Sequence, residues 1–180
     1  MMSNTLLESV VKKNRARLIP FMLALYVLAF LDRSNIGFAK ETYQLDTGLS
    51  NEAYALGAGI FFVVYAFLWV PANLLMRKFG ARRWIGCTTL LWGVLSAAMA
   101  WADTEAKFLL VRTLLGAAEA GFFPGMIYLT SQWFPQQNRA SIMGLFYMGA
   151  PLALTLGSPL SGALLEMHGF MGHPGWFWMF

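Results

Sequence analysis

The chain has 180 residues, of which 58% are hydrophobic and 12% are charged, and its formal net charge at pH 7 is +4. A soluble domain carries roughly a quarter charged residues, so this composition argues for a protein surrounded by lipid. The basic residues lie at the ends of apolar runs and not along one polar face, which argues against a nucleic-acid partner. Cys87 is the only cysteine, so an intrachain disulfide is excluded, and no spacing typical of a metal or cofactor site occurs.

Five stretches of the sequence are long and apolar enough to be membrane helices. A helix needs roughly 20 apolar residues to cross about 30 Å of hydrocarbon. In chain order the predicted spans are 18–39, 55–76, 84–102, 108–130 and 141–165, and the start of a sixth is expected at Trp176. The connections are short, so residues 1–180 are expected to form one all-α membrane bundle of antiparallel helices.

Lysines and arginines are distributed unequally between the two ends of these predicted spans. With the N-terminus in the cytoplasm, only Lys40 and Lys107 lie on the outer side. Basic residues concentrate on the cytoplasmic side of membrane proteins, so the sequence predicts a cytoplasmic N-terminus. The nine inner basic residues are Lys12, Lys13, Arg15, Arg17, Arg77, Lys78, Arg82, Arg83 and Arg139.

Ionisable residues lie inside two of the predicted spans. They are Asp32 and Arg33 in the first span, and Arg112 and Glu119 in the fourth. Each costs on the order of 3 kcal/mol at mid-bilayer, so we expect them to face one another or a wet cavity. Two guanidinium groups offer planar forks of donors that fit a carboxylate, which favours a site for an anion. In the alternative they form structural ion pairs, either Asp32 with Arg112 or Arg33 with Glu119.

The arrangement of these groups can be estimated from helix geometry. Arg112 and Glu119 are nearly two full turns apart and share one helix face, so Arg112 is the expected partner of Glu119. Both acids are candidates to carry protons, because burial and a neighbouring arginine act in opposite directions on a carboxyl group. Tyr65 lies inside the second span and either faces the same cavity or packs between helices. Pro124 is expected to loosen the fourth span, and the run GSPLSG at 157–162 to bend the fifth. For Pro151 alone, simple tolerance of proline in a membrane helix is the favoured interpretation.

Several longer motifs resemble a known family. They are FLDRSNIGFA in the first span, YAFLWVPANLLMRKFGARR across the second span and its loop, VRTLLGAAEAGFFPG in the fourth span, and WFPQQNRA after it. In these motifs, which cover nearly the whole chain, the sequence resembles the major facilitator superfamily and within it the anion:cation symporters. The likeness is greatest to enterobacterial sugar-acid transporters of the rhamnonate type, with tartrate, galactonate and phthalate carriers as relatives.

The resemblance implies a twelve-helix protein of the bacterial inner membrane, built of two six-helix halves. This chain would be most of the N-terminal half, truncated at the start of the sixth helix, and its partners would be the lipid bilayer and the missing C-terminal half. The implied activity is uptake of a small organic anion by alternating access, driven by protons rather than sodium. By motif match, Arg33, Tyr65 and Arg112 would contact substrate, and Asp32 and Glu119 would be the protonatable pair.

The loop after the second span departs from the family pattern. That pattern reads G-x-x-x-D-R-x-G-R-K/R, and here Gly80, Arg82 and Arg83 keep it. Asn73 and Arg77 stand where the first glycine and the aspartate are expected. The resemblance therefore does not extend to the inner-gate contact of that aspartate.

Two other function classes compete with a transporter. An enzyme embedded in the membrane needs a nucleophile and a base, or metal ligands, at one depth, and the predicted spans contain no histidine and a single cysteine. We therefore predict neither an enzyme nor a cofactor. The other class is a structural subunit in which the buried charges only hold helices together, and a flux assay on the full-length protein separates it from a carrier.

Overall fold

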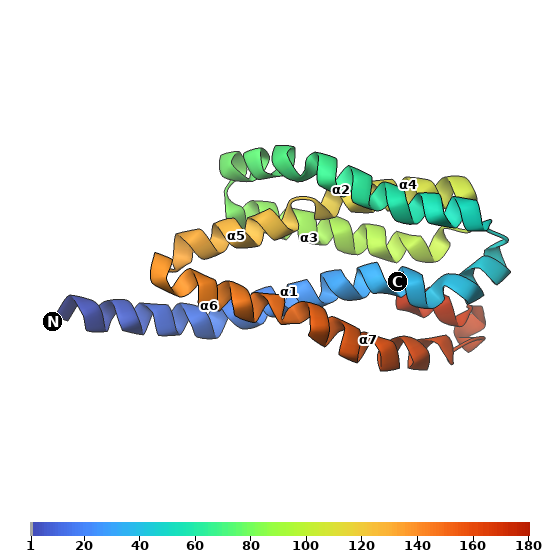
Figure 1. The fold of residues 1–180 in the computed structure, drawn as a ribbon. Helices are drawn as coiled ribbons and strands as arrows, with labels where there is room; N and C mark the ends of the chain where they lie inside the picture. The colour runs from blue at the N-terminus through green and yellow to red at the C-terminus, as the bar shows by residue number, and fades with distance from the viewer. Residues whose placement is uncertain (1) are drawn as a thin grey trace.

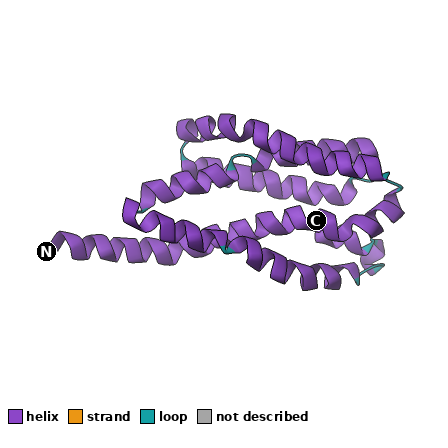
Figure 2. Ribbon diagram, in the orientation of Figure 1, coloured by secondary structure: helices purple, strands orange, loops and turns teal. Residues whose placement is uncertain are grey.

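The computed structural model describes the backbone of residues 2–180 and the side chains of residues 8–180. Helices account for all the regular structure of this described part, and it contains no strand (Figure 2). The predicted all-α fold is therefore confirmed. The elements are α1 (Met2–Thr47), α2 (Asn51–Phe79), α3 (Ala81–Ala98), η1 (Met99–Trp101), α4 (Glu105–Glu119), α5 (Phe122–Trp133), α6 (Gln136–Tyr147), α7 (Gly149–Leu165), η2 (Phe170–Gly172) and η3 (Gly175–Met179).

The helices run back and forth along one common axis (Figure 1). Five segments of the described chain are long and apolar enough to cross a membrane: Glu8–Thr47, Asn51–Phe79, Ala81–Trp101, Glu105–Trp133 and Gln136–Leu165. At 46 residues, α1 is about 69 Å long, and its N-terminal part extends beyond the bundle (Figure 1). The turn from α2 to α3 and the turn from α5 to α6 lie at that same end of the bundle (Figure 1).

Small residues bring the main helix pairs together. α2 packs most extensively against α4, and α1 against α7. A Cβ added at Gly116 of α4 would lie 2.4 Å from the backbone oxygen of Phe61 in α2, and one at Gly57 would meet the ring of Phe108. In lipid the apolar surfaces of helices gain little by association, so close backbone approach provides much of the packing.

Two of the membrane segments are broken helices. α4 ends at Glu119 and α5 begins at Phe122, because Pro124 has no N–H to donate to the carbonyl of Ala120. The loosening expected from Pro124 is thus present at this point. The other interruption lies at Met148, between α6 and α7, near Pro151. The run 157–162, which was expected to contribute a bend, lies within the single helix α7.

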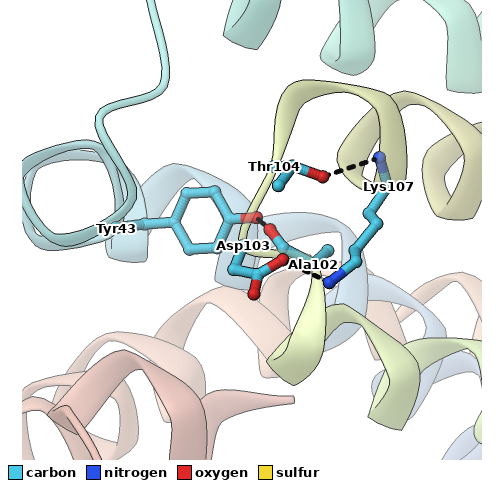
Figure 3. A network of polar contacts seen from close by, with 5 residues as sticks. All are labelled: Tyr43, Ala102, Asp103, Thr104 and Lys107. Atoms are coloured by element: carbon cyan, nitrogen blue, oxygen red, sulfur yellow. Dashed lines mark hydrogen bonds and ion pairs between the residues drawn. The ribbon is translucent and has the colours of Figure 1, made fainter.

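The end of the bundle opposite the N-terminus is tied together by polar contacts. The Tyr43 hydroxyl of α1 donates to the carbonyl of Ala102, beside the start of α4 (Figure 3). The Thr104 hydroxyl accepts from the backbone N–H of Lys107 and caps α4. The Lys107 ammonium donates to Asp103 at 2.6 Å, and this hydrogen bond lowers the pKa of the Asp103 carboxyl. Trp176, where a sixth span was expected to begin, lies in η3 and donates its indole N–H to Asp46 at 2.8 Å.

Candidate anion and proton site

The four ionisable residues that the sequence places inside the predicted spans all point into the bundle. Asp32, Arg112 and Glu119 are buried, with 6%, 2% and 1% of their surface exposed. The Arg33 side chain is 20% exposed and is the most accessible of the four. α1 supplies Asp32 and Arg33, and α4 supplies Arg112 and Glu119, so the cluster joins side chains of these two helices inside the bundle.

Arg33 and Glu119 form an ion pair between α1 and α4. The Arg33 Nε donates to Glu119 Oε2 at 2.8 Å, and Arg33 Nη2 lies 2.6 Å from the same oxygen. The other carboxylate oxygen, Oε1, is buried and has no hydrogen-bond partner among the described residues. The guanidinium fork is therefore engaged by one oxygen of an internal carboxylate, and a bidentate carboxylate bridge is not formed.

The expectation that Arg112 is the partner of Glu119 is wrong. The Arg112 Nε donates to the backbone carbonyl of Gly57 in α2, at 3.3 Å. Its Cζ lies 4.6 Å from the centre of the Phe61 ring. Arg112 and Glu119 do lie on the same face of α4. The Arg112 side chain, however, extends toward α2, and the cation that contacts Glu119 is Arg33 of α1.

Aromatic rings enclose the Arg33 guanidinium. Its Cζ lies 4.8 Å from the ring centre of Tyr65 and 5.7 Å from those of Phe30 and Phe61. Cation–π contacts of this kind hold a guanidinium while leaving its N–H edges free to bind. Tyr65 was expected either to face the charged residues or to pack between helices, and in the structure its ring lies against the Arg33 guanidinium.

Phe61 is a residue of this cluster that the sequence reasoning missed. Its ring lies next to the guanidinium groups of both Arg33 and Arg112. Gly57, Phe61 and Tyr65 are spaced four residues apart and occupy one face of α2. This spacing could have predicted the position of Phe61, because residues four apart in a helix lie on the same face and Phe61 therefore faces the same side as Tyr65.

Asp32 is oriented toward α3. Its Oδ1 accepts a hydrogen bond from the hydroxyl of Ser96, while its Oδ2 is buried without a partner among the described residues. The Asp32 carboxyl group is also close enough to the Arg112 guanidinium and to the Glu119 carboxyl group to interact with both. Ser96 was not singled out from the sequence, because a serine in a membrane helix is unremarkable until its neighbour is known.

The loop residues form a separate feature at the end of the bundle that carries the N-terminus. Gly80 has a φ of 83°, a conformation that L side chains rarely adopt, and it joins α2 directly to α3. Arg82 and Arg83 are exposed there. Together with Tyr128 and Trp133 they line a cavity of about 620 Å³. No residue of the charged cluster lines this cavity.

The charged cluster has the chemistry of an anion site. It offers one partly accessible guanidinium fork, a second buried guanidinium and two carboxyl groups that each keep one oxygen unpartnered. An incoming carboxylate would compete with Glu119 for Arg33. Among the described residues there is no group of three or more His, Cys, Asp or Glu side chains that could hold a metal ion.

Comparison with known proteins agrees with this chemistry. Residues 22–180 match the family description Major Facilitator Superfamily. Inner membrane transport protein RhmT of Escherichia coli (strain K12) is 92% identical over 179 residues, which cover 99% of this chain and 42% of that protein. A putative tartrate transporter of Agrobacterium vitis is 51% identical over 178 residues, covering 99% of this chain and 40% of that protein. These names describe transport and not catalysis.

The fold matches a solved transporter as well. A bacterial homologue of the human lysosomal transporter Spinster, in an inward-facing and occupied conformation, superimposes with a TM-score of 0.81 at 22% identity. The match covers 86% of this chain and 34% of that protein. The chain therefore spans about two fifths of the length of the curated relatives it matches. It belongs to the Major Facilitator Superfamily.

Proposed function

We propose that this chain is the N-terminal part of a secondary active transporter that takes up a small organic anion of the sugar-acid type together with protons. The observation that carries the proposal is the ion pair between Arg33 and Glu119, placed inside membrane-spanning helices of a major facilitator protein. The name of the tartrate transporter, and the resemblance to rhamnonate-type carriers, support a sugar acid as the substrate class.

Arg33 is the proposed anchor for the substrate carboxylate. Its planar fork fits a carboxylate with two parallel hydrogen bonds, and its side chain is the most accessible of the cluster. The Tyr65 ring fixes the guanidinium from one side and offers a hydroxyl to a sugar acid. Arg112 is fully buried and bonded to a backbone carbonyl, so we assign it a supporting role: its positive charge attracts the anion.

Glu119 is the proposed coupling residue. In its charged form it occupies the fork of Arg33 and competes with the substrate. A proton on Glu119 removes that negative charge and frees the donors of Arg33 for the incoming carboxylate. Proton binding thus favours anion binding, and by thermodynamic reciprocity anion binding favours protonation of Glu119. Asp32, whose carboxyl interacts with that of Glu119, is the second protonatable group of the pair.

Transport requires a second helical bundle around this site. Alternating access moves one bundle against another around a site near the bilayer midplane, and this chain spans only about two fifths of its relatives. We propose that the remaining part of the protein completes the cavity. The N-terminus of the chain is proposed to lie in the cytoplasm, on the basis of the nine inner basic residues against two outer ones.

Uptake by the full-length protein in liposomes tests the proposal. Proteoliposomes with an alkaline interior are placed in acidic buffer with labelled tartrate and labelled hexonates, and a neutral sugar serves as the control. The expected result is saturable accumulation of at least one sugar acid, which collapses when a protonophore removes the pH gradient. Absence of uptake for every acid, or uptake that is indifferent to the protonophore, contradicts the proposal.

A further inference from the structure

The cavity at the α2–α3 turn is separate from the charged cluster and has a chemistry of its own. The end of α2, the start of α3 and α5 form its walls, and its volume is about 620 Å³. The α2–α3 turn lies at the end of the bundle that carries the N-terminus (Figure 1). The side chains that line the cavity include guanidinium groups, an amide and aromatic rings, and none is acidic. They are Phe79, Ala81, Arg82, Arg83, Tyr128, Leu129, Gln132 and Trp133.

The two arginines of this cavity have no counter-ion in the described part of the chain. Neither the Arg82 nor the Arg83 guanidinium takes part in an ion pair or a hydrogen bond there. The segment 77–83, RKFGARR, carries four basic residues, and the sequence has no acidic residue between Glu52 and Asp103. The opposite wall, α5, has no charged residue. An anion from outside these residues is therefore the complementary ligand.

The donors of the cavity favour a phosphate group. Guanidinium forks bind phosphate oxygens with two parallel hydrogen bonds, and the cavity offers two such forks side by side in the sequence. The Gln132 amide and the Tyr128 hydroxyl add neutral donors on the α5 side. Gly80 caps the start of α3 without a side-chain hydrogen bond, so the first N–H groups of this helix are also available to an anion.

The cavity also has an apolar side, which distinguishes a lipid from a free phosphate ion. Phe79 and Trp133 line it and are each about half-exposed, and Leu75, one turn before Phe79 on α2, is exposed as well. Tryptophan rings gather where the lipid headgroups meet the hydrocarbon, and one membrane segment ends at Phe79 itself. A ligand with a phosphate at one end and acyl chains at the other matches both sides, whereas inorganic phosphate would use only the arginine side.

We propose that this cavity binds the headgroup of an anionic phospholipid from the leaflet on the side of the N-terminus. Arg82 and Arg83 hold its phosphate, while the aromatic side of the cavity packs against the glycerol and the first acyl carbons. Arg77 stands where the family pattern has an aspartate, so the lipid phosphate supplies the negative charge that this turn lacks. Basic pockets between membrane helices suit such headgroups in general. The site is independent of the substrate that the protein carries.

Lipid-dependent melting of the full-length protein tests this proposal. The purified protein in a neutral detergent is titrated with phosphatidylglycerol, with phosphatidylcholine of the same acyl chains, or with inorganic phosphate. A ligand that binds only the folded state raises the melting temperature, so phosphatidylglycerol is expected to give a saturable rise that the other two do not give. Replacing both cavity arginines, Arg82→Gln with Arg83→Gln, is expected to raise the half-saturating concentration of phosphatidylglycerol at least about tenfold.

Two further pairs of substitutions separate the cavity from charge in general. Lys13→Gln with Arg17→Gln removes two exposed charges from the N-terminal part of α1, which do not line the cavity, and should keep the affinity of the parent protein. Arg82→Lys with Arg83→Lys keeps the charges that orient the turn in the membrane, so this variant should insert and fold normally. Its binding of phosphatidylglycerol is nevertheless expected to be weaker than that of the parent, because lysine lacks the planar fork.

Several results would overturn the proposal. An equal rise with phosphatidylcholine would show a general lipid effect, and an equal rise with inorganic phosphate would assign the cavity to a free anion. A loss of affinity in the Lys13 and Arg17 control as large as that in the arginine variants would show diffuse charge attraction. No rise with phosphatidylglycerol, or unchanged affinity when Arg82 and Arg83 are replaced, would exclude a lipid at this cavity. Melting requires no transport, so these results do not depend on the proposed function.

Discussion

The guanidinium of Arg33 is held by one carboxylate oxygen and by three aromatic rings. A buried ion pair of this kind contributes little net stability, because removing both ions from water offsets most of their attraction. The presence of this ion pair inside membrane helices is therefore better explained by a role in which a substrate carboxylate replaces Glu119 on Arg33 than by a contribution to stability. Arg112, by contrast, is bonded to the backbone of α2 and is almost inaccessible.

This difference predicts unequal effects of two matching substitutions. A lysine keeps the positive charge but loses the planar fork. Arg33→Lys in the full-length protein is expected to weaken substrate binding by at least about tenfold, or roughly 1.4 kcal/mol, because a bidentate grip is lost. Arg112→Lys, tested in parallel, is expected to have the smaller effect on affinity. Calorimetric titration with the transported acid measures both, and equal or reversed losses would contradict the assignment of Arg33 as anchor.

The ionisable residues of the cluster were predictable from the sequence, and Arg33 with Glu119 was one of the two ion pairs considered, but the sequence did not determine which acid meets which arginine. The rule that charges inside a membrane helix face a partner or a cavity was sufficient to select Asp32, Arg33, Arg112 and Glu119. Which acid meets which arginine depends on the rotation and axial shift of α1 against α4, and spacing within one helix carries no information on either. Ser96 was missed for the same reason, since its role depends on Asp32 of another helix, whereas the four-residue spacing from Tyr65 could have indicated Phe61.

At the scale of the helices, the contact between α2 and α4 positions the cluster. Gly57 and Phe61 of α2 contact Arg112 of α4, and Gly116 allows the backbones to approach. The helix break also affects the cluster, because Glu119 is the last residue of α4. The carboxylate proposed to couple protons to transport thus lies next to the break between α4 and α5.

Adding one methyl group to this contact is expected to destabilise the protein. The Cβ of Gly116→Ala would lie 2.4 Å from a backbone oxygen that cannot move freely. The expected cost is about 1–3 kcal/mol, as for other overpacked sites, seen as a lower melting temperature of the full-length protein in detergent. Gly59→Ala in α2, where a Cβ meets nothing within 4 Å, is the control and should melt like the parent protein. Equal melting temperatures for all three proteins would show that the α2–α4 contact is loose.

Helix-scale features divide into those that local sequence determines and those that tertiary packing determines. Apolar length indicates the membrane segments, and Pro124 indicates the break after α4, because both effects act within a few residues. The length of α1 was not predictable, since its polar N-terminal turns form a helix outside the apolar run. The proline-containing run at 157–162 stays helical within α7, because proline in a membrane helix is tolerated where neighbours support the backbone.

At the scale of the whole molecule, the charge asymmetry is the basis of the proposed orientation in the membrane. Reporter fusions to an enzyme active only in the periplasm are expected to be silent after Gly80 and Gln137 and active after Asp46 and Glu105. The turns that join α2 to α3 and α5 to α6 lie at the end of the bundle that carries the N-terminus, and those that join α1 to α2 and α3 to α4 lie at the opposite end (Figure 1). Activity at Gly80 and Gln137 with silence at Asp46 and Glu105 would reverse the proposed topology.

The central claim is that a proton on Glu119 releases Arg33 for the substrate, and Glu119→Gln tests it most directly. The amide is uncharged like the protonated acid, and its oxygen still accepts a hydrogen bond from Arg33, so folding should be preserved. In proteoliposomes of the full-length protein, this variant is expected to exchange labelled for unlabelled substrate across the membrane but to lose accumulation driven by an imposed pH gradient. If the Glu119→Gln protein still concentrates substrate in response to the gradient, Glu119 does not couple protons to transport and its pair with Arg33 is structural.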